Sequence, residues 1–127
     1  MKIYIAHSRD FDYLNELYKP LRNDMFFKDY ELILPHEQLN SNNKRDFYND
    51  IDLFIAECSY PSTGLGIELA FAFYSGKGIY CLHKKDKKIS GSLNVITSNI
   101  FEYDTIEEMI NIIKNIIINY KKDNFTK

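Results

Sequence analysis

The segment Asp52–Ala72 reads DLFIAECSYPSTGLGIELAFA and has the clearest local pattern in the chain. After its opening aspartate it has a short apolar run, which is typical of a buried strand over residues 52–56. A loop rich in Ser, Pro and Thr follows over residues 57–64, and residues 65–75 have the length and spacing of a helix. This order of strand, loop and helix is the repeating unit of a parallel α/β sheet.

The same alternation continues on both sides of this segment. Strands are predicted at residues 2–6, 31–34, 79–82 and 99–103, and helices at 11–21, 44–50, 92–97 and 105–120. Asp10 is expected to cap the first helix, and Pro20 to distort its last turn. Right-handed crossovers between such strands give a mainly parallel sheet covered on both faces. We therefore expect one domain over residues 1–127, a flavodoxin-like (Rossmann-like) α/β three-layer sandwich with a five-stranded, mainly parallel sheet.

The composition limits the partners of the chain. Sixteen Lys and Arg against eighteen Asp and Glu give a formal charge of −2, which argues against binding a nucleic acid polymer. The apolar run at residues 3–6 is too short for a secretion signal, and no run has membrane-spanning length. We expect a cytoplasmic protein with no membrane partner. Cys58 and Cys81 have neither a CxxC partner nor histidine spacing suited to zinc, so we expect buried thiols and no metal site.

Glu68 is the first candidate for chemistry. It falls in the first turn of the predicted helix, after Gly64 and Gly66, whose small size lets backbone amides approach a ligand. A carboxylate at such a place is the nucleophile that a retaining glycosyl transfer needs. An ordinary glutamate favoured by the helix dipole would occupy the same position. On the residues alone, both interpretations stay open.

The three histidines all fall near the predicted carboxyl ends of strands, where ligands of such sheets bind. His7 and His36 directly follow strands. We expect them to line the crevice, where they bind phosphate or base or protonate a leaving base. His83 is expected to be a loop histidine bound by backbone groups.

These features resemble the nucleoside 2-deoxyribosyltransferase superfamily, and most of all its 2′-deoxynucleoside 5′-phosphate N-hydrolase branch. The matching motifs are DLFIAE at residues 52–57, PSTGLG at 61–66 and Glu68-Leu69. The resemblance implies that Glu68 attacks the anomeric carbon of a deoxyribose and forms a covalent sugar–enzyme intermediate. Water resolves this intermediate in the hydrolases, and a second nucleobase does so in the transferases. No cofactor is implied, and the expected partner is a small nucleoside or nucleotide.

The resemblance also implies roles for a tyrosine and two serines. Tyr4 matches a tyrosine that hydrogen-bonds near the nucleophile, although a β-forming aromatic also suits the core. Ser62 matches a serine that contacts the 5′-phosphate. Ser92 matches a serine that a neighbouring subunit contributes to the same phosphate. The resemblance thus implies a homodimer or higher oligomer with shared active sites.

An isologous interface for this oligomer has a candidate in one predicted helix. Its aromatic residues are Phe71, Phe73 and Tyr74. The alternative is that these side chains cover the sheet, which we expect for Phe71.

Two positions depart from the family pattern. The chain has Ala6-His7-Ser8-Arg9-Asp10 where the N-hydrolases carry a Gly-Ser-Ile-Arg-Gly type of loop. Ser8 keeps its place and Arg9 stands one position early, and both are candidate substrate-binding residues. Lys44 stands where the family has an aspartate, and Asp46 is the candidate to replace it as a catalytic residue.

These departures keep two alternatives open. One is base exchange by a transferase. The other is a non-catalytic nucleotide-binding module of the same fold, such as a phosphoacceptor receiver domain. A receiver would want an aspartate at the end of the third strand, where this chain has Glu57.

Overall fold

The structure is a computed structural model that describes residues 1–37 and 50–125. Its strands form one sheet in the order β2-β1-β3-β4-β5, and every neighbouring pair is parallel. The strands are β1 (Lys2–His7), β2 (Glu31–Ile33), β3 (Leu53–Glu57), β4 (Gly78–Lys84) and β5 (Ile100–Tyr103). This order confirms the expected flavodoxin-like sheet.

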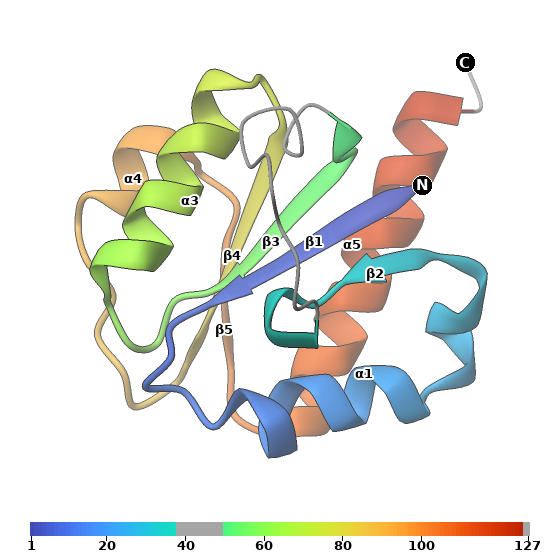
Figure 1. Ribbon diagram of the computed structural model, residues 1–127, viewed down its shortest axis with the longest axis horizontal. Coiled ribbons are helices and arrows are strands. Elements are labelled where there is room, and N and C mark those ends of the chain that lie inside the picture. Colours follow the sequence, from blue (N-terminus) through green and yellow to red (C-terminus); the bar gives the residue numbers. More distant parts are fainter. Residues whose placement is uncertain (38–49, 126–127) are drawn as a thin grey trace.

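Helices cover both faces of the sheet and complete three layers. On one face lie α3 (Thr63–Tyr74) and α4 (Leu93–Ile96), and on the other α1 (Lys19–Asn23) and α5 (Ile106–Phe125) (Figure 1). Side chains alternate along a strand, so β1 contributes Ile3 and Ile5 to the core under α1 and α5, and Tyr4 and Ala6 to the core under α3. The sheet therefore separates two apolar cores.

The segment 11–21 is not the single regular helix that the sequence predicts. A turn of π-helix at Leu14–Tyr18 leads directly into α1, and Pro20 lies at the start of α1. A proline is tolerated in a first helical turn, where it displaces few helical hydrogen bonds. Asp10 does not cap this segment. Its backbone amide instead donates to the Ser8 Oγ at 3.1 Å.

The helix α3 begins two residues before its predicted start. The Ser62 Oγ accepts a hydrogen bond from the Leu65 amide at 3.2 Å and so caps the helix at Thr63. Glu68 therefore lies in the second turn and not in the first, contrary to expectation. Because the dipole acts mainly within the first turn, it influences Glu68 less than expected.

The other described elements begin and end close to their predicted positions. The exception is α5, which continues to Phe125 instead of ending at Tyr120. The predicted helix at 44–50 falls almost wholly outside the described residues. Phe71 was expected to cover the sheet, but it is 44% exposed. Among the described residues, none of the helices combines the length and the apolar character needed to cross a lipid bilayer.

Candidate active site

Glu68 is held by a tyrosine of the sheet. The Tyr4 hydroxyl on β1 donates a hydrogen bond to the Glu68 Oε2. The Tyr4 ring is 5% exposed and stacks on Phe54 of β3, with the ring centroids 5.2 Å apart. Stacking fixes the ring, and the ring fixes the carboxylate, which is itself half-buried. A carboxylate held in one orientation is suited to nucleophilic attack.

Four aromatic rings gather where β1 and β2 end. His7 stacks on Tyr13 with centroids 4.5 Å apart and meets Tyr18 edge-on at 5.2 Å. His36 lies 4.6 Å from Tyr13 and 5.0 Å from His7. The structure thus brings together the two histidines predicted to line the crevice. We call these four side chains the ring cluster.

His7 is the sealed member of the ring cluster, being 5% exposed. Its Nδ1 lies 2.9 Å from the Ser8 carbonyl oxygen, and its Nε2 lies 2.7 Å from the Tyr18 hydroxyl. A carbonyl only accepts, so Nδ1 carries the proton and Tyr18 donates to Nε2. Burial lowers the pKa of His7, the Ser8 carbonyl opposes this shift, and His36 adds to it. Neutral His7 therefore positions Tyr18 and is not placed to donate a proton to a ligand.

The Tyr18 hydroxyl joins the His7 side chain to the backbone of His36. It accepts a hydrogen bond from the His36 amide at 3.0 Å. Burial raises the pKa of Tyr18, and a smaller contribution comes from the charge of Glu68. Glu68 itself belongs to α3, which lies on the other face of the sheet from the core that holds Tyr18.

His36, Arg9 and Ser8 differ in how far they face solvent. His36 and Arg9 are both exposed, and the pKa of His36 is lowered by partial burial and by the charge of Arg9. Ser8 is 1% exposed, and its hydroxyl shapes the turn after β1. Of these three residues, Arg9 and His36 are thus the ones that solvent reaches, and Ser8 is buried.

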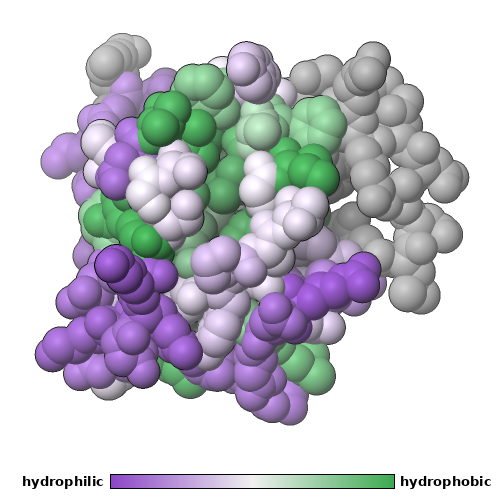
Figure 2. Space-filling view, turned by 90° about the vertical axis from the view of Figure 1, so that its left-hand side faces the viewer, coloured by the Kyte–Doolittle hydropathy of each residue, from purple (hydrophilic) through white to green (hydrophobic). Residues whose placement is uncertain are grey.

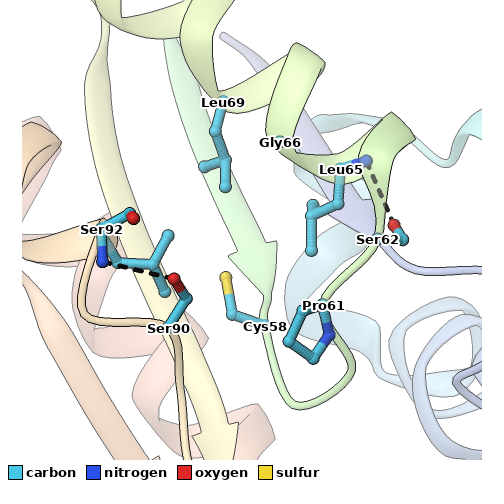
Figure 3. A pocket seen from close by; sticks show the side chains of 9 residues that line it. Cys58, Pro61, Ser62, Leu65, Gly66, Leu69, Ser90 and Ser92 are labelled. Atoms are coloured by element: carbon cyan, nitrogen blue, oxygen red, sulfur yellow. Dashed lines mark hydrogen bonds between the residues drawn. The ribbon is translucent and has the colours of Figure 1, made fainter.

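A cavity of about 170 Å³ separates α3 from the segment before α4. Ser62 stands on one side of it and Ser90 and Ser92 on the other (Figure 3). The cavity is lined by Cys58, Pro61, Ser62, Leu65, Gly66, Leu69, Ser90, Ser92 and Leu93. Neither Tyr4 nor Glu68 belongs to this lining. Ser62 and Ser92 of the same chain therefore line one cavity. Glu68 lies on a side of α3 that does not face this cavity.

The first turn of α3 carries small residues and has free space around its two glycines. A Cβ atom added at Gly64 or Gly66 would meet no other atom within 4 Å, so packing within the described residues does not require glycine there. The Gly66 amide donates to the Ser62 carbonyl at 3.1 Å. The Thr63 and Gly64 amides come before Gly66, the first amide with a backbone acceptor in the helix, so their N–H groups point out of its N-terminal end. A helix end of this kind binds anions through its amides.

Glu57 is a second carboxylate at the carboxyl end of the sheet, and it is sealed. It accepts hydrogen bonds from the Ser59 amide at 2.9 Å, the Ser59 hydroxyl at 2.7 Å and the Tyr103 hydroxyl at 2.5 Å. Burial raises the pKa of Glu57, and the Tyr103 and Ser59 hydroxyls oppose this shift. A phosphoacceptor must be reachable by solvent, so a side chain that is 1% exposed does not support the receiver-domain interpretation.

The remaining candidates are placed as follows. Asp46 and Lys44 lie outside the described residues, so the predicted replacement stays a prediction. The His83 Nδ1 lies 3.0 Å from the Lys84 carbonyl oxygen, so a backbone group binds His83 as expected, but His83 lies in β4 and not in a loop. Cys58 and Cys81 are buried free thiols. In residues 1–37 and 50–125, no three His, Cys, Asp or Glu side chains gather where a metal ion would bind.

Sequence reasoning missed Tyr13 and Tyr18. The place of Tyr18 in the predicted helix at 11–21 does not indicate its hydrogen bonds to His7 and His36. One signal could have indicated this role. Tyr18 falls among apolar positions in the segment that follows the first strand, and a buried tyrosine hydroxyl usually has a polar partner.

No protein-family model matches the sequence, and no curated protein matches it. Among solved structures, the chain is similar to the Clostridium botulinum CMP N-glycosidase BcmB. The TM-score is 0.66 at 20% sequence identity, and the alignment covers 91% of this chain and 99% of that chain. At this identity the likeness shows the fold, which agrees with the three-layer sandwich described above.

Proposed function

We propose that the chain is an N-glycosidase that cleaves the bond between base and sugar in 2′-deoxynucleoside 5′-monophosphates. The observation that carries this proposal is the hydrogen bond from the buried Tyr4 to Glu68. Retaining glycosidases need an oriented carboxylate of this kind as nucleophile. The motifs around Glu68 and the similarity in fold to a CMP N-glycosidase support the same class of reaction.

In the proposed reaction Glu68 performs a double displacement. A carboxylate oxygen attacks the anomeric carbon, the carbon–nitrogen bond breaks, and the base leaves with the bonding electrons. Water then attacks the same carbon and breaks its ester bond to Glu68. Overall, water supplies a hydroxyl group to the sugar 5-phosphate and a proton to the base. Tyr4 keeps the attacking carboxylate in line during both steps.

The surrounding groups suit the two ends of a nucleotide. The base stacks beside Tyr13 and His36. It takes its proton from solvent as it leaves, because a histidine whose pKa is lowered is neutral near pH 7. The 5′-phosphate binds at the start of α3, where the Ser62 hydroxyl still has its proton to donate and the Thr63 and Gly64 amides face outward. Arg9 adds a positive charge at the same end of the sheet.

The test is a chromatographic assay of base release. The panel contains the common nucleosides and 5′-monophosphates in both the ribose and the deoxyribose series, including CMP and dCMP, with and without a second free base. We expect base release from monophosphates, and its loss in Glu68→Ala. Turnover only when a second base is present would instead indicate a transferase. Tight nucleotide binding without any turnover would overturn the proposal in favour of a binding module.

The proposed enzyme works as a homodimer with shared sites. The apolar side chains of α3 and α4 gather on one face of the molecule (Figure 2). Ile67 is 53% exposed, Tyr74 87% and Val95 79%, which is unusual for large apolar groups on one surface. The chain's own Ser92 lines the cavity beside Ser62, so a shared site requires that a second copy packed on this face bring its Ser92 to the phosphate as well, as the resemblance implies.

Two variants test the shared site by complementation. Glu68→Ala and Ser92→Ala are each expected to have low activity alone. After mixing and subunit exchange, half of the dimers combine one of each and contain one intact site, so about a quarter of the wild-type activity should return. Tyr74→Glu should yield a monomer in sedimentation velocity. No recovery on mixing, with exchange shown independently, would contradict a shared site.

A further inference from the structure

The ammonium group of Lys84 lies where three segments around the site meet. Lys84 is the last residue of β4, and its Nζ is 2.9 Å from the Glu16 Oε1. The same Nζ lies 5.3 Å from the centroid of the Phe11 ring and 5.5 Å from that of Tyr60. The Lys84 side chain is 22% exposed and the Glu16 side chain 30%. The ion pair is therefore partly shielded from solvent, and salt screens it less than an exposed pair.

Each of these contacts belongs to a segment that carries proposed site residues. Phe11 lies two residues after Arg9, in the loop that follows β1. Glu16 lies in the π-helical turn that also holds Tyr18. Tyr60 lies two residues before Ser62, in the loop that follows β3. The Phe11 and Tyr60 rings are themselves 6.0 Å apart, so the two loops touch directly beside the ammonium group.

The backbone of Lys84 is anchored to the sealed carboxylate. Its amide donates to the Ser59 Oγ at 2.8 Å, and that hydroxyl donates to Glu57. Burial alone would lower the pKa of the Lys84 ammonium, but Glu16 and Tyr60 raise it above its ordinary value. The cation is thus fixed at its base by the sheet and held at its tip by two loops.

We infer that Lys84 is a positioning residue, whose cation holds the β1 loop and the β3 loop in the arrangement that binds the substrate. The inference rests on the proposed function. A cation serves this purpose better than an apolar side chain, because only a cation attracts a carboxylate and two aromatic faces at once. Without the Lys84 cation, the contact between the Phe11 and Tyr60 rings remains, and the Lys87 Nζ still lies 4.9 Å from the Tyr60 centroid, but the link to Glu16 is lost. The two loops are then held less firmly, and the groups that bind phosphate and base lose their alignment.

Kinetics of three variants test this role. Lys84→Met keeps most of the length of the side chain and removes the charge, and Lys84→Arg keeps the charge. Lys85→Met is the matched control at the next residue of the chain, which is exposed. We expect Lys84→Met to raise KM about tenfold with kcat changed less than about threefold, because alignment of binding groups is lost. Lys84→Arg should recover most of the affinity, and Lys85→Met should match the wild type.

Amide hydrogen exchange tests the same role without any turnover. In Lys84→Met, exchange should accelerate at least about threefold in residues 9–13 and 58–62 and stay unchanged in β1 and β3. Unchanged exchange in both loops, or equal effects in Lys84→Met and Lys85→Met, would overturn the inference. If no substrate is turned over, this measurement still decides whether Lys84 couples the loops, so failure of the proposed function is recognised separately.

Discussion

Glu57 and Glu68 lie on opposite faces of one sheet, and each accepts a hydrogen bond from a tyrosine hydroxyl. Glu57 is 1% exposed and has three donors from Ser59 and Tyr103. Glu68 is half-buried, so solvent reaches its carboxylate. A glutamate and a tyrosine therefore form a fully buried hydrogen-bonded pair on one face of the sheet. On the other face, the same two residue types form a pair whose oriented carboxylate is partly open to solvent. What separates the two roles is access and not residue type.

The largest expected effect concerns the open carboxylate. Glu68→Gln should lower the rate of base release at least about a thousandfold, because an amide does not serve as the nucleophile. The melting temperature should change by less than about 3 °C, since no sealed group loses its partner. Base release and thermal unfolding measured on one preparation check both parts. A variant that kept a tenth of the activity would remove Glu68 from the chemistry.

The sealed carboxylate should give the opposite result. Glu57→Ala leaves the buried hydroxyls of Tyr103 and Ser59 without their acceptor, so the free energy of unfolding should fall by about 3 kcal/mol. Tyr103→Phe removes one donor and should cost about 1 kcal/mol. Urea unfolding measures both. A stable Glu57→Ala protein with no activity would break the comparison, because Glu57 would then be part of the chemistry.

The two histidines of the ring cluster extend the comparison to pH. At pH values well above 6.5, the ordinary pKa of histidine, His7 is neutral in both the folded and the unfolded chain. As the pH falls below that value, the unfolded chain takes up the proton first, so stability is lost as the pH approaches the lowered pKa of the folded state. Urea unfolding between about pH 7.5 and about pH 5 should show this loss, and His7→Gln should reduce it.

The exposed ring supplies the control for that experiment. His36→Gln should keep most of the pH dependence of stability and should slow base release instead. Equal slopes in the wild type and His7→Gln would show that His7 is not the sealed group.

The smallest expected effect separates the two serines at the cavity. Ser62→Ala should lower the free energy of unfolding by about 1 kcal/mol, because Ser62 caps α3. Ser92 is exposed, and Ser92→Ala should change stability by less than about 0.5 kcal/mol. Both variants should raise KM for monophosphates more than for nucleosides. Equal effects on both substrates would place the phosphate elsewhere.

Most of the fold could be predicted because it follows from local patterns. Short apolar runs alternate with helical spacing, and that alternation alone predicts a parallel sheet and its ligand edge. The start of α3 was misplaced because Ser62 was assigned to a loop, although a serine before Thr-Gly-Leu is also a helix cap. Because the helix begins earlier than predicted, Glu68 lies in its second turn and not in its first.

The site was predictable only in part. The neighbours of Glu68 came from motifs within one segment and from one strand residue, Tyr4. The ring cluster depends on side chains from two distant segments, which no local spacing specifies. The sequence predicts His7 and His36 at the same edge of the sheet, but it does not show that the Tyr13 ring contacts both of them. Nor does it show that the Tyr18 hydroxyl binds the buried His7. That distinction comes from packing.

The π-helical turn at Leu14–Tyr18 holds one residue more than an α turn would. The deletion of one residue within this turn would therefore restore regular helical spacing and leave the residues on either side in place, with Leu21 still in the core. The regular helix α1 has no extra residue to lose, so a deletion there would rotate every following residue by about 100°. Homologous chains that keep this fold should therefore vary in length by one residue in the π turn, but not in α1.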